Sequence, residues 1–465
     1  MQFEFCRLQI SDLFVLPRLQ EHSLANILDG KPSTIAIESK KFFDFIKERK
    51  KVVLYGETLQ GKTITSRYLF LRLRSKGIIP VLLDGENFNE KNIKQTIKNA
   101  FDEQYSSNAA EAFTALNKSE RALIIDNFGA NGLIQSQLQQ VLNKLCEDFD
   151  YVIAVAHINL RLQQFIQNEN QEIRFSDYTH CEIKPFNSSQ RKDLIQKWVK
   201  LANASKSEDV LLREINQHEQ IVETACDSGL LVPYPAYILG VLTVNESAKQ
   251  NVDESKYGTV GYLYESLITA QFAKLEEEID LQQIYILLGE MAYNAFKNER
   301  LDISFEETQQ IINSYQSEYL QNIYIERFIR QILKAGVVLE QNKRFRFSSV
   351  QLRDFFVANY YTRAINDKER SAKAYEEIDY IIKRVTYESH TRILLFLVYK
   401  ANDKPHFIEQ ILNVSRIIFS NFLPTDLKED VAFLNELKDT NIPTPKLIES
   451  NSVWERREKL SSKNA

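Results

Sequence analysis

Two glycines, a lysine and a hydroxyl side chain occur early in this chain at the spacing G-x-x-x-x-G-K-[ST]. Glycines let such a loop turn its N–H groups inward, and a helix that follows adds partial positive charge, so the loop suits phosphate groups. Lys62 would then face the β- and γ-phosphates of a nucleotide, and the Thr63 hydroxyl would bind Mg²⁺. The expected nucleotide-binding residues are Gly56, Glu57, Thr58, Leu59, Gln60, Gly61, Lys62, Thr63 and Ile64.

A carboxylate at the end of an apolar run supplies the second part of such a site. Leu123-Ile124-Ile125 reads as a buried strand, and Asp126 ends it, where an acid can hold Mg²⁺ together with Thr63. The next residue is Asn127, at a position where hydrolytic enzymes of this kind usually carry a second acid. An amide cannot accept a proton from the attacking water, so the sequence predicts slow turnover unless another base contributes.

Three further side chains are candidates for contacts with phosphate. His157 follows an apolar run and is expected near the γ-phosphate with a catalytic role, beside Lys62 and Asp126; an ordinary loop histidine is the alternative. Arg161 and Arg174 could contact phosphate of this chain or of a neighbouring copy, or be solvated charges. The cofactors expected from these residues are a nucleoside triphosphate, whose base they leave open, and Mg²⁺.

Strands and helices alternate around these residues, which favours a parallel sheet with right-handed crossovers. The fold class predicted is therefore an α/β P-loop NTPase domain, followed by mostly α-helical lid, winged-helix and C-terminal regions. Pro80 places the second of the strands at the sheet edge, since proline cannot donate to a neighbouring strand. The expected strands are 51–55, 78–83, 121–126, 151–156 and 179–183, with helices over about 64–76, 90–116 and 133–147.

The chain reads as mostly helical from Asn187 onward. Expected helices include 236–244 and a stretch over 261–297, with a polar loop or hinge over 245–256 between them. Two short β signals, 336–339 and 344–347, flank a turn and precede a helix over 350–364. Helices with a small hairpin are the arrangement of a winged helix.

Composition bounds the class of protein. Of 465 residues, 44% are hydrophobic and 26% charged, which is ordinary for a globular protein, and the net charge of -5 gives no global attraction to nucleic acid. The four cysteines are scattered and indicate a reducing compartment. The first residues lack the pattern of a signal peptide, and no apolar run approaches the ~20 residues that span a bilayer. We therefore expect a cytoplasmic protein without membrane contact.

Together these segments resemble the STAND class of P-loop ATPases, relatives of the NACHT and AAA+ groups. Residues 11–19 are similar to the segment that packs on adenine in that class, which implies a nucleotide contact for Val15. Pro235 stands where the class has a lid proline that contacts the nucleotide. The segment 344–358 resembles the end of its winged helix, although Phe347 is followed by Ser348 where many NACHT proteins have a histidine.

The resemblance implies a division of the chain. The expected parts are an N-terminal segment (1–30), the nucleotide domain (31–186), a helical lid (187–255), a winged-helix domain (256–365) and a C-terminal helical region with a tail (366–465). Nothing precedes the ATPase module that could serve as an effector, so the resemblance implies an effector or sensor on a separate protein, or a truncated chain.

The function implied is a nucleotide-controlled switch that forms a homo-oligomer on activation, in bacterial signalling or antiphage defence. The first alternative is a continuously cycling AAA+-type ATPase that acts on DNA or protein, with Lys343, Arg344 and Arg346 forming a small basic wing. The second is an ATP-dependent transcription regulator. DNA binding is thus possible but not favoured, because the overall charge is acidic. A small-molecule kinase leaves the long helical half without a role.

Overall fold

A computed structural model gives the fold of the chain. The chain divides into two compact units, Met1–Cys226 with Val232–Leu242, and Asp227–Leu231 with Thr243–Ala465. The domain boundaries expected from the sequence stay predictions. The residues that the structure describes are 9–22, 34–87, 93–105, 110–130, 135–158, 160, 177–202, 207–227, 229–250, 260–273, 275, 279–341, 343–400 and 405–421.

The first unit contains a sheet whose described strands follow the order β2-β1-β7-β3-β6-β5-β4. The five from β7 to β4 are parallel, whereas β1 and β2 add to β7 as antiparallel strands. Strand β6 lies between β3, which precedes the phosphate loop, and β5, which carries Asp126. An inserted strand at this place is the ASCE arrangement of P-loop NTPases. The strands are β1 (Leu19–His22), β2 (Thr34–Ile37), β3 (Lys51–Gly56), β4 (Ile79–Asp84), β5 (Arg121–Phe128), β6 (Tyr151–His157) and β7 (Thr179–Ile183).

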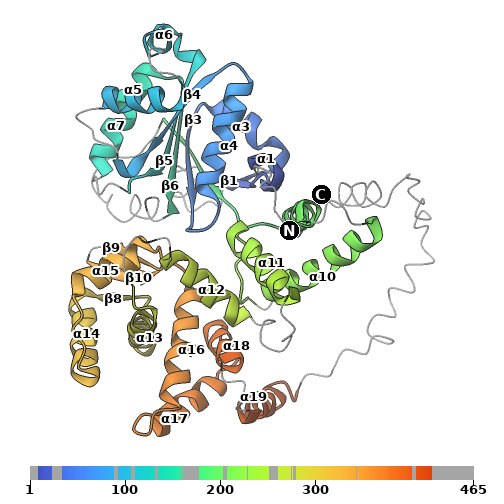
Figure 1. The fold of residues 1–465 in the computed structure, drawn as a ribbon, viewed down its shortest axis with the longest axis vertical. Coiled ribbons are helices and arrows are strands. Elements are labelled where there is room, and N and C mark those ends of the chain that lie inside the picture. Colours follow the sequence, from blue (N-terminus) through green and yellow to red (C-terminus); the bar gives the residue numbers. More distant parts are fainter. Residues whose placement is uncertain are drawn as a thin grey trace. The chain divides into compact units, whose positions relative to one another are not determined.

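Helices cover both faces of this sheet, because its central strands are apolar on both sides. One face packs on α5, α6 and α7 through residues such as Tyr55, Leu83 and Ile125. The other packs on α3 and α4 through residues such as Leu54 and Ile124. Figure 1 shows α5 and α7 on one side of the sheet and α3 and α4 on the other. These helices are α3 (Phe42–Arg49), α4 (Lys62–Ser75), α5 (Ile93–Gln104), α6 (Ala110–Ala115) and α7 (Gln135–Asp148).

The N-terminal segment of the first unit contacts helices α4 and α9. Helix α1 packs on α9, and the ring of Phe14 stacks on Tyr68 of α4 at 4.4 Å between centroids. Gln190 of α9 donates to the backbone oxygen of Leu16 at 2.7 Å. The segment is thus held between α4 and α9. The further helices described in this unit are α1 (Ile10–Leu13), α9 (Ser188–Ala202), α10 (Glu208–Asp227) and α11 (Pro235–Gln250), whose later half belongs to the second unit.

The second unit has the element order of a winged helix. Strand β10 lies between β8 and β9 in an antiparallel sheet, and the hairpin expected over 336–347 is confirmed. None of the helices in the described part of the chain is long and apolar enough to cross a bilayer. The elements are α12 (Val260–Phe272), α13 (Leu281–Lys297), β8 (Asp302–Ser304), α14 (Phe305–Tyr319), α15 (Ile325–Lys334), β9 (Val338–Gln341), β10 (Arg344–Phe347), α16 (Val350–Ala364), α17 (Ser371–Ile382), α18 (Glu388–Lys400) and α19 (Pro405–Ile418).

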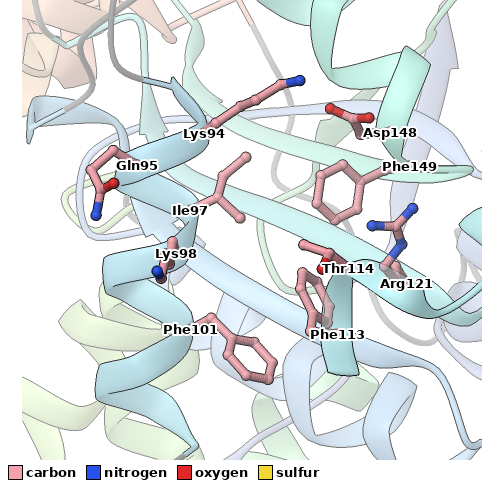
Figure 2. Close-up of a pocket in the computed structure, with 10 residues that line it drawn as sticks. All are labelled: Lys94, Gln95, Ile97, Lys98, Phe101, Phe113, Thr114, Arg121, Asp148 and Phe149. Carbon is pink, nitrogen blue, oxygen red and sulfur yellow. The ribbon is translucent and has the colours of Figure 1, made fainter. Parts of the chain in front are cut away.

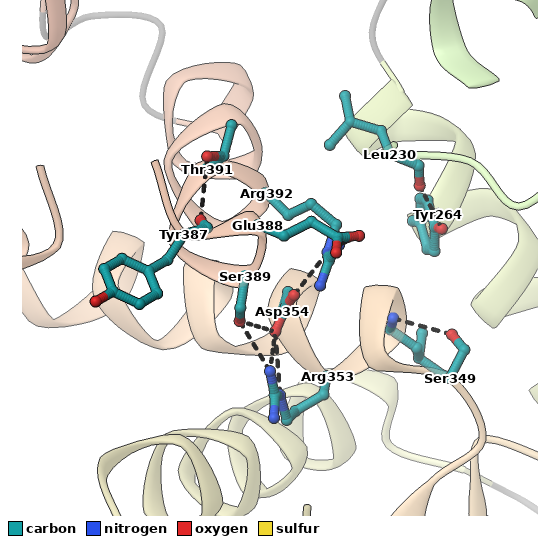
Figure 3. Close-up of polar contacts among 11 residues, drawn as sticks. Leu230, Tyr264, Ser349, Arg353, Asp354, Tyr387, Glu388, Ser389, Thr391 and Arg392 are labelled. Atoms are coloured by element: carbon teal, nitrogen blue, oxygen red, sulfur yellow. Dashed lines mark hydrogen bonds and ion pairs between the residues drawn. The ribbon is translucent and has the colours of Figure 1, made fainter. Parts of the chain in front are cut away.

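A buried charged network fixes α16 against α18 (Figure 3). Asp354 of α16 is fully buried, and its two oxygens accept hydrogen bonds from Arg353 Nη2 at 2.7 Å, Ser389 Oγ at 2.9 Å and Arg392 Nε at 2.8 Å. Both arginines are also largely buried. A buried carboxylate is stable only where such partners replace water, so these side chains depend on one another.

Several local expectations are corrected by the structure. The helical stretch expected over 90–116 is two helices, α5 and α6. The helices expected over 261–297 are α12 and α13. The hinge expected over 245–256 is wrong in its first part, because α11 continues to Gln250. The placement of Pro80 at a sheet edge is confirmed, since β4 ends the strand order. Strands β1, β2 and β8 are additional to those expected.

Candidate functional site

The phosphate loop lies between β3 and α4, in the order strand, loop, helix. Gly61 has φ of +90° at the start of α4, a conformation that glycine adopts without strain. Leu59 has φ of +66°, which is uncommon for a branched side chain and occurs where loops are shaped around ligands. No side chain caps the N-terminus of α4, so its first N–H groups remain available to an anion.

The ammonium group of Lys62 lies inside this loop. Its Nζ donates to the backbone oxygen of Glu57 at 2.7 Å. Burial lowers the pKa of Lys62 to about 8, and the nearby carboxylates of Glu57 and Asp126 act in the opposite direction. A phosphate group in the loop would supply the negative charge that this partly desolvated cation lacks.

Asp126 lies directly behind the first turn of α4. Its side chain is largely buried, and its Oδ1 accepts a hydrogen bond from Ser66 Oγ at 3.2 Å. Thr63, three residues before Ser66, is exposed at the helix start. A hydroxyl and a carboxylate at one edge are hard oxygen ligands that Mg²⁺ accepts together with phosphate oxygens and water. The residues present therefore fit a magnesium ion, which Thr63 and Asp126 would hold.

His157 is brought to the loop by the pairing of β3 with β6, in which it is the register partner of Gly56. Its Nε2 lies 3.5 Å from a carboxylate oxygen of Glu57 and 3.4 Å from the hydroxyl of Thr58. The histidine thus contacts the loop, where a triphosphate would be within reach. The candidates Arg161 and Arg174 lie outside the described residues.

The side chain of Gln60 braces the loop from within. It is buried, accepts from the backbone N–H of Glu57 at 2.6 Å and donates to the backbone oxygen of Ile183 on β7. A Cβ at Gly56 would lie 3.0 Å from Gln60 Oε1, so glycine is what allows this packing. Gln60 therefore shapes the loop with its side chain and can offer only its backbone to a nucleotide.

The lid residue Pro235 lies against the loop within the same unit. A Cβ at Gly61 would be 3.6 Å from Pro235 Cγ. The segment before it is fixed by a hydrogen bond from the N–H of Phe186 to the oxygen of Pro233, 2.9 Å long. Val15 is buried in the N-terminal segment between α4 and α9. Loop, Pro235 and N-terminal segment thus belong to one compact unit, and nucleotide contacts of Val15 and Pro235 stay predictions.

Sequence reasoning missed two contributors. One is Ser66, which donates a hydrogen bond to Asp126. Its spacing of three residues from Thr63 puts both side chains on one face of α4, so the sequence could have indicated it. The second contributor is Asp84, the last residue of β4. It accepts a hydrogen bond from Asn127 Nδ2 at 3.2 Å, and its in-register partner is Asp126. Only the pairing of β4 with β5 reveals that these residues adjoin.

A cavity lies next to Arg121, the first residue of β5, at the end of the strand away from Asp126 (Figure 2). Its volume is about 530 Å³. The rings of Phe113 and Phe149 lie next to each other, 6.1 Å apart, and the carbon of the Arg121 guanidinium is 5.7 and 5.6 Å from their centroids. Lys94 and Lys98 of α5 also line it. The cavity adjoins the amino ends of β5 and β6 and so is no part of the phosphate-loop site.

Comparisons with known proteins give likeness in structure alone. No protein-family model matches the chain, and no curated protein matches its sequence. Among solved structures, the ORC2 protein of Aeropyrum pernix is 12% identical over 66% of this chain and 85% of its own, with a TM-score of 0.33. A Walker-type ATPase of Pyrococcus abyssi is 12% identical over 67% and 94%, with a TM-score of 0.36. DnaA from Aquifex aeolicus is 13% identical over 72% and 98%, with a TM-score of 0.28.

Such scores carry no argument about function. The assignment of the P-loop fold therefore rests on this chain's own geometry, which is the strand order of the sheet and the loop between β3 and α4.

Proposed function

We propose that this chain is an ATP- and ADP-binding switch of the STAND type that hydrolyses ATP slowly. The observation that carries the proposal is the position of Lys62, half-buried in a glycine loop at an uncapped helix N-terminus with Asp126 nearby. A desolvated cation aimed into such a loop suits a phosphate chain. Lys62 would bind the β- and γ-phosphates, Thr63 and Asp126 would hold Mg²⁺, and His157 would contact the terminal phosphate.

The contact between lid and loop supports a switch. Pro235 packs on Gly61, and Gln190 of the lid helix α9 holds the N-terminal segment at Leu16. A nucleotide in the loop would lie next to Pro235 of the lid, and the lid in turn holds the N-terminal segment. A ligand shifts a two-state equilibrium by its differential affinity for the two states, so exchange of ADP for ATP could open or close this arrangement.

The consequences proposed for the cell follow from the resemblance. The resting chain holds ADP, and a trigger allows ATP to enter and homo-oligomers to form. The oligomer then engages an effector or sensor protein, in bacterial signalling or antiphage defence. A cytoplasmic location suits such a role.

The test is a pair of lysine variants. Lys62→Ala removes the cation at the loop and is expected to abolish measurable ATP and ADP binding in a calorimetric titration. Lys98→Ala removes an equal charge from the exposed face of α5 at the other end of the sheet, and binding should not change. Wild-type affinity in Lys62→Ala would refute the assignment of the loop.

The nucleotide that the protein carries when freshly purified tests the switch itself. Near-stoichiometric ADP released on denaturation supports a closed resting state. An empty protein that turns over ATP steadily supports a freely cycling ATPase instead.

DNA binding through the winged helix is the second candidate, and one observation favours it. Helix α15 exposes Arg327, Arg330 and Lys334, which share one face. The β9–β10 wing offers less positive charge to DNA than its sequence suggests, because Arg344 forms an ion pair with Asp302 at 2.7 Å. Two results would favour this candidate over the switch. They are ATP turnover that DNA stimulates, and an affinity for DNA that falls steeply as the salt concentration rises.

A further inference from the structure

The residue after Asp126 is Asn127, which cannot act as a general base in the proposed site. Hydrolysis of ATP needs a group that accepts a proton from the attacking water, and the amide of Asn127 cannot do so. The structure places a carboxylate next to that amide. Asn127 Nδ2 donates to Asp84 Oδ1 at 3.2 Å, and Asp84 is the last residue of β4.

The pairing of β4 with β5 sets the direction of this carboxylate. Asp84 and Asp126 are register partners on adjacent parallel strands, which lie about 4.8 Å apart. The preceding partners, Leu83 and Ile125, belong to the core under α5, α6 and α7. Because side chains alternate along a strand, Asp84 and Asp126 both lie on the face that α4 covers. That is the face on which Ser66 bonds Asp126.

The backbone around Asp84 is built for this close approach. Gly85 follows it, and a Cβ there would come within 2.5 Å of the backbone oxygen of Asn127. Only glycine therefore lets the end of β4 lie so near the end of β5. Asn127 itself has φ of +53°, a left-handed conformation that asparagine tolerates better than most residues.

Asp84 is also oriented and accessible. Its Oδ1 accepts from Asn127 and from the backbone N–H of Glu86 at 3.1 Å. The side chain is exposed, and no hydrogen bond within the described part of the chain uses Oδ2. Two donors on one oxygen hold the carboxylate in place and leave the other oxygen to a water molecule.

We propose that Asp84 is the general base of ATP hydrolysis in this chain and that Asn127 positions it. The inference rests on the proposed binding of ATP at the phosphate loop. A water oxygen attacks the γ-phosphorus, the bond from that phosphorus to the β,γ-bridging oxygen breaks, and Asp84 Oδ2 takes the proton from the water. The products are ADP and inorganic phosphate.

The rival explanation is that Asp84 only caps the turn of Gly85–Asn87 through the N–H of Glu86. Asp84→Asn separates the two, because the amide oxygen still accepts that hydrogen bond but is not basic. Single-turnover cleavage of γ-labelled ATP should fall about 100-fold or more in Asp84→Asn. ATP affinity, measured by titration, should stay close to that of the wild type.

Glu86→Gln is the matched control, since it removes one exposed carboxylate two residues along the same turn. It should cleave ATP at the wild-type rate. Asn127→Gly keeps the left-handed backbone and deletes the amide, so it should slow cleavage and leave ATP affinity unchanged. This split between chemistry and binding is what a positioning residue produces.

Two results would overturn the assignment of Asp84. One is an Asp84→Asn variant that binds and cleaves ATP at the wild-type rate, with faster cleavage in Asn127→Glu, which would mean that the wild type lacks a base at this edge. The other is a wild-type chain that binds ATP and never cleaves it. A wild-type chain that binds no ATP would instead refute the proposed function itself.

Discussion

At the scale of single residues, Lys62 determines how the site responds to pH. Burial holds its pKa at about 8 in the free protein, below the ordinary lysine value of 10.5. Unfolding restores the higher value, so between pH 8 and 10.5 the unfolded chain binds more protons than the folded one. By linkage, this group's contribution to stability rises with pH across that window.

Nucleotide binding should show the opposite trend. Phosphate favours the charged lysine, so above pH 8 binding must return a proton to Lys62, and affinity should fall up to about tenfold per pH unit. Calorimetry at pH 9 in buffers of different ionisation enthalpy should give uptake of roughly one proton per ATP, and almost none from this lysine at pH 7. No uptake at pH 9 would mean that Lys62 stays charged in the free protein.

At the scale of elements, the buried network of Asp354 joins α16 to α18. Replacing Asp354 with leucine leaves Arg353 buried without its carboxylate partner and leaves Arg392 only its pair with the exposed Glu388, which costs about 3–5 kcal/mol. Asp379→Leu is the control, since its pair with Lys383 on α17 is exposed and is worth at most about 1 kcal/mol. Urea unfolding followed by circular dichroism checks both. Equal losses in the two variants would show that the network adds no stability.

The strands themselves show what could be predicted from the sequence. The strands over 51–55, 121–126 and 151–156 were predictable because they are apolar on both faces, a pattern that depends on no neighbour. Strands β1 and β2 are four residues each, and β1 reads Leu-Gln-Glu-His. They exist because β7 offers an edge to pair with, which no local pattern records.

The residues of the candidate site also fall into those that the sequence predicts and those that it does not. The loop and Asp126 follow from motifs that carry their own spacing. The resemblance assigned Pro235 to the nucleotide but did not predict that it lies near Gly61, and the pairing of Asp84 with Asp126 depends on which strands adjoin. Contacts made across the sheet are properties of topology, so the sequence could supply the residues but not their partners.

At the scale of the whole molecule, α11 is an element that both units share. It begins at Pro235 beside the phosphate loop, and its residues from Thr243 onward belong to the second unit. A continuous helix transmits a displacement of its first turn along its axis. If the chain is a switch, the non-hydrolysable ATP analogue should produce a species larger than the monomer, and ADP should not.

Interrupting α11 tests this coupling. Gly240→Pro removes a backbone donor and clashes with the preceding turn, so it breaks the helix, whereas Gly240→Ala strengthens it by about 0.5–1 kcal/mol. Light scattering after gel filtration should find the analogue-induced oligomer in Gly240→Ala and only monomer in Gly240→Pro, with ATP bound by both. If both variants form the oligomer equally, breaking α11 has no effect on assembly. The nucleotide signal would then reach the second unit by another route.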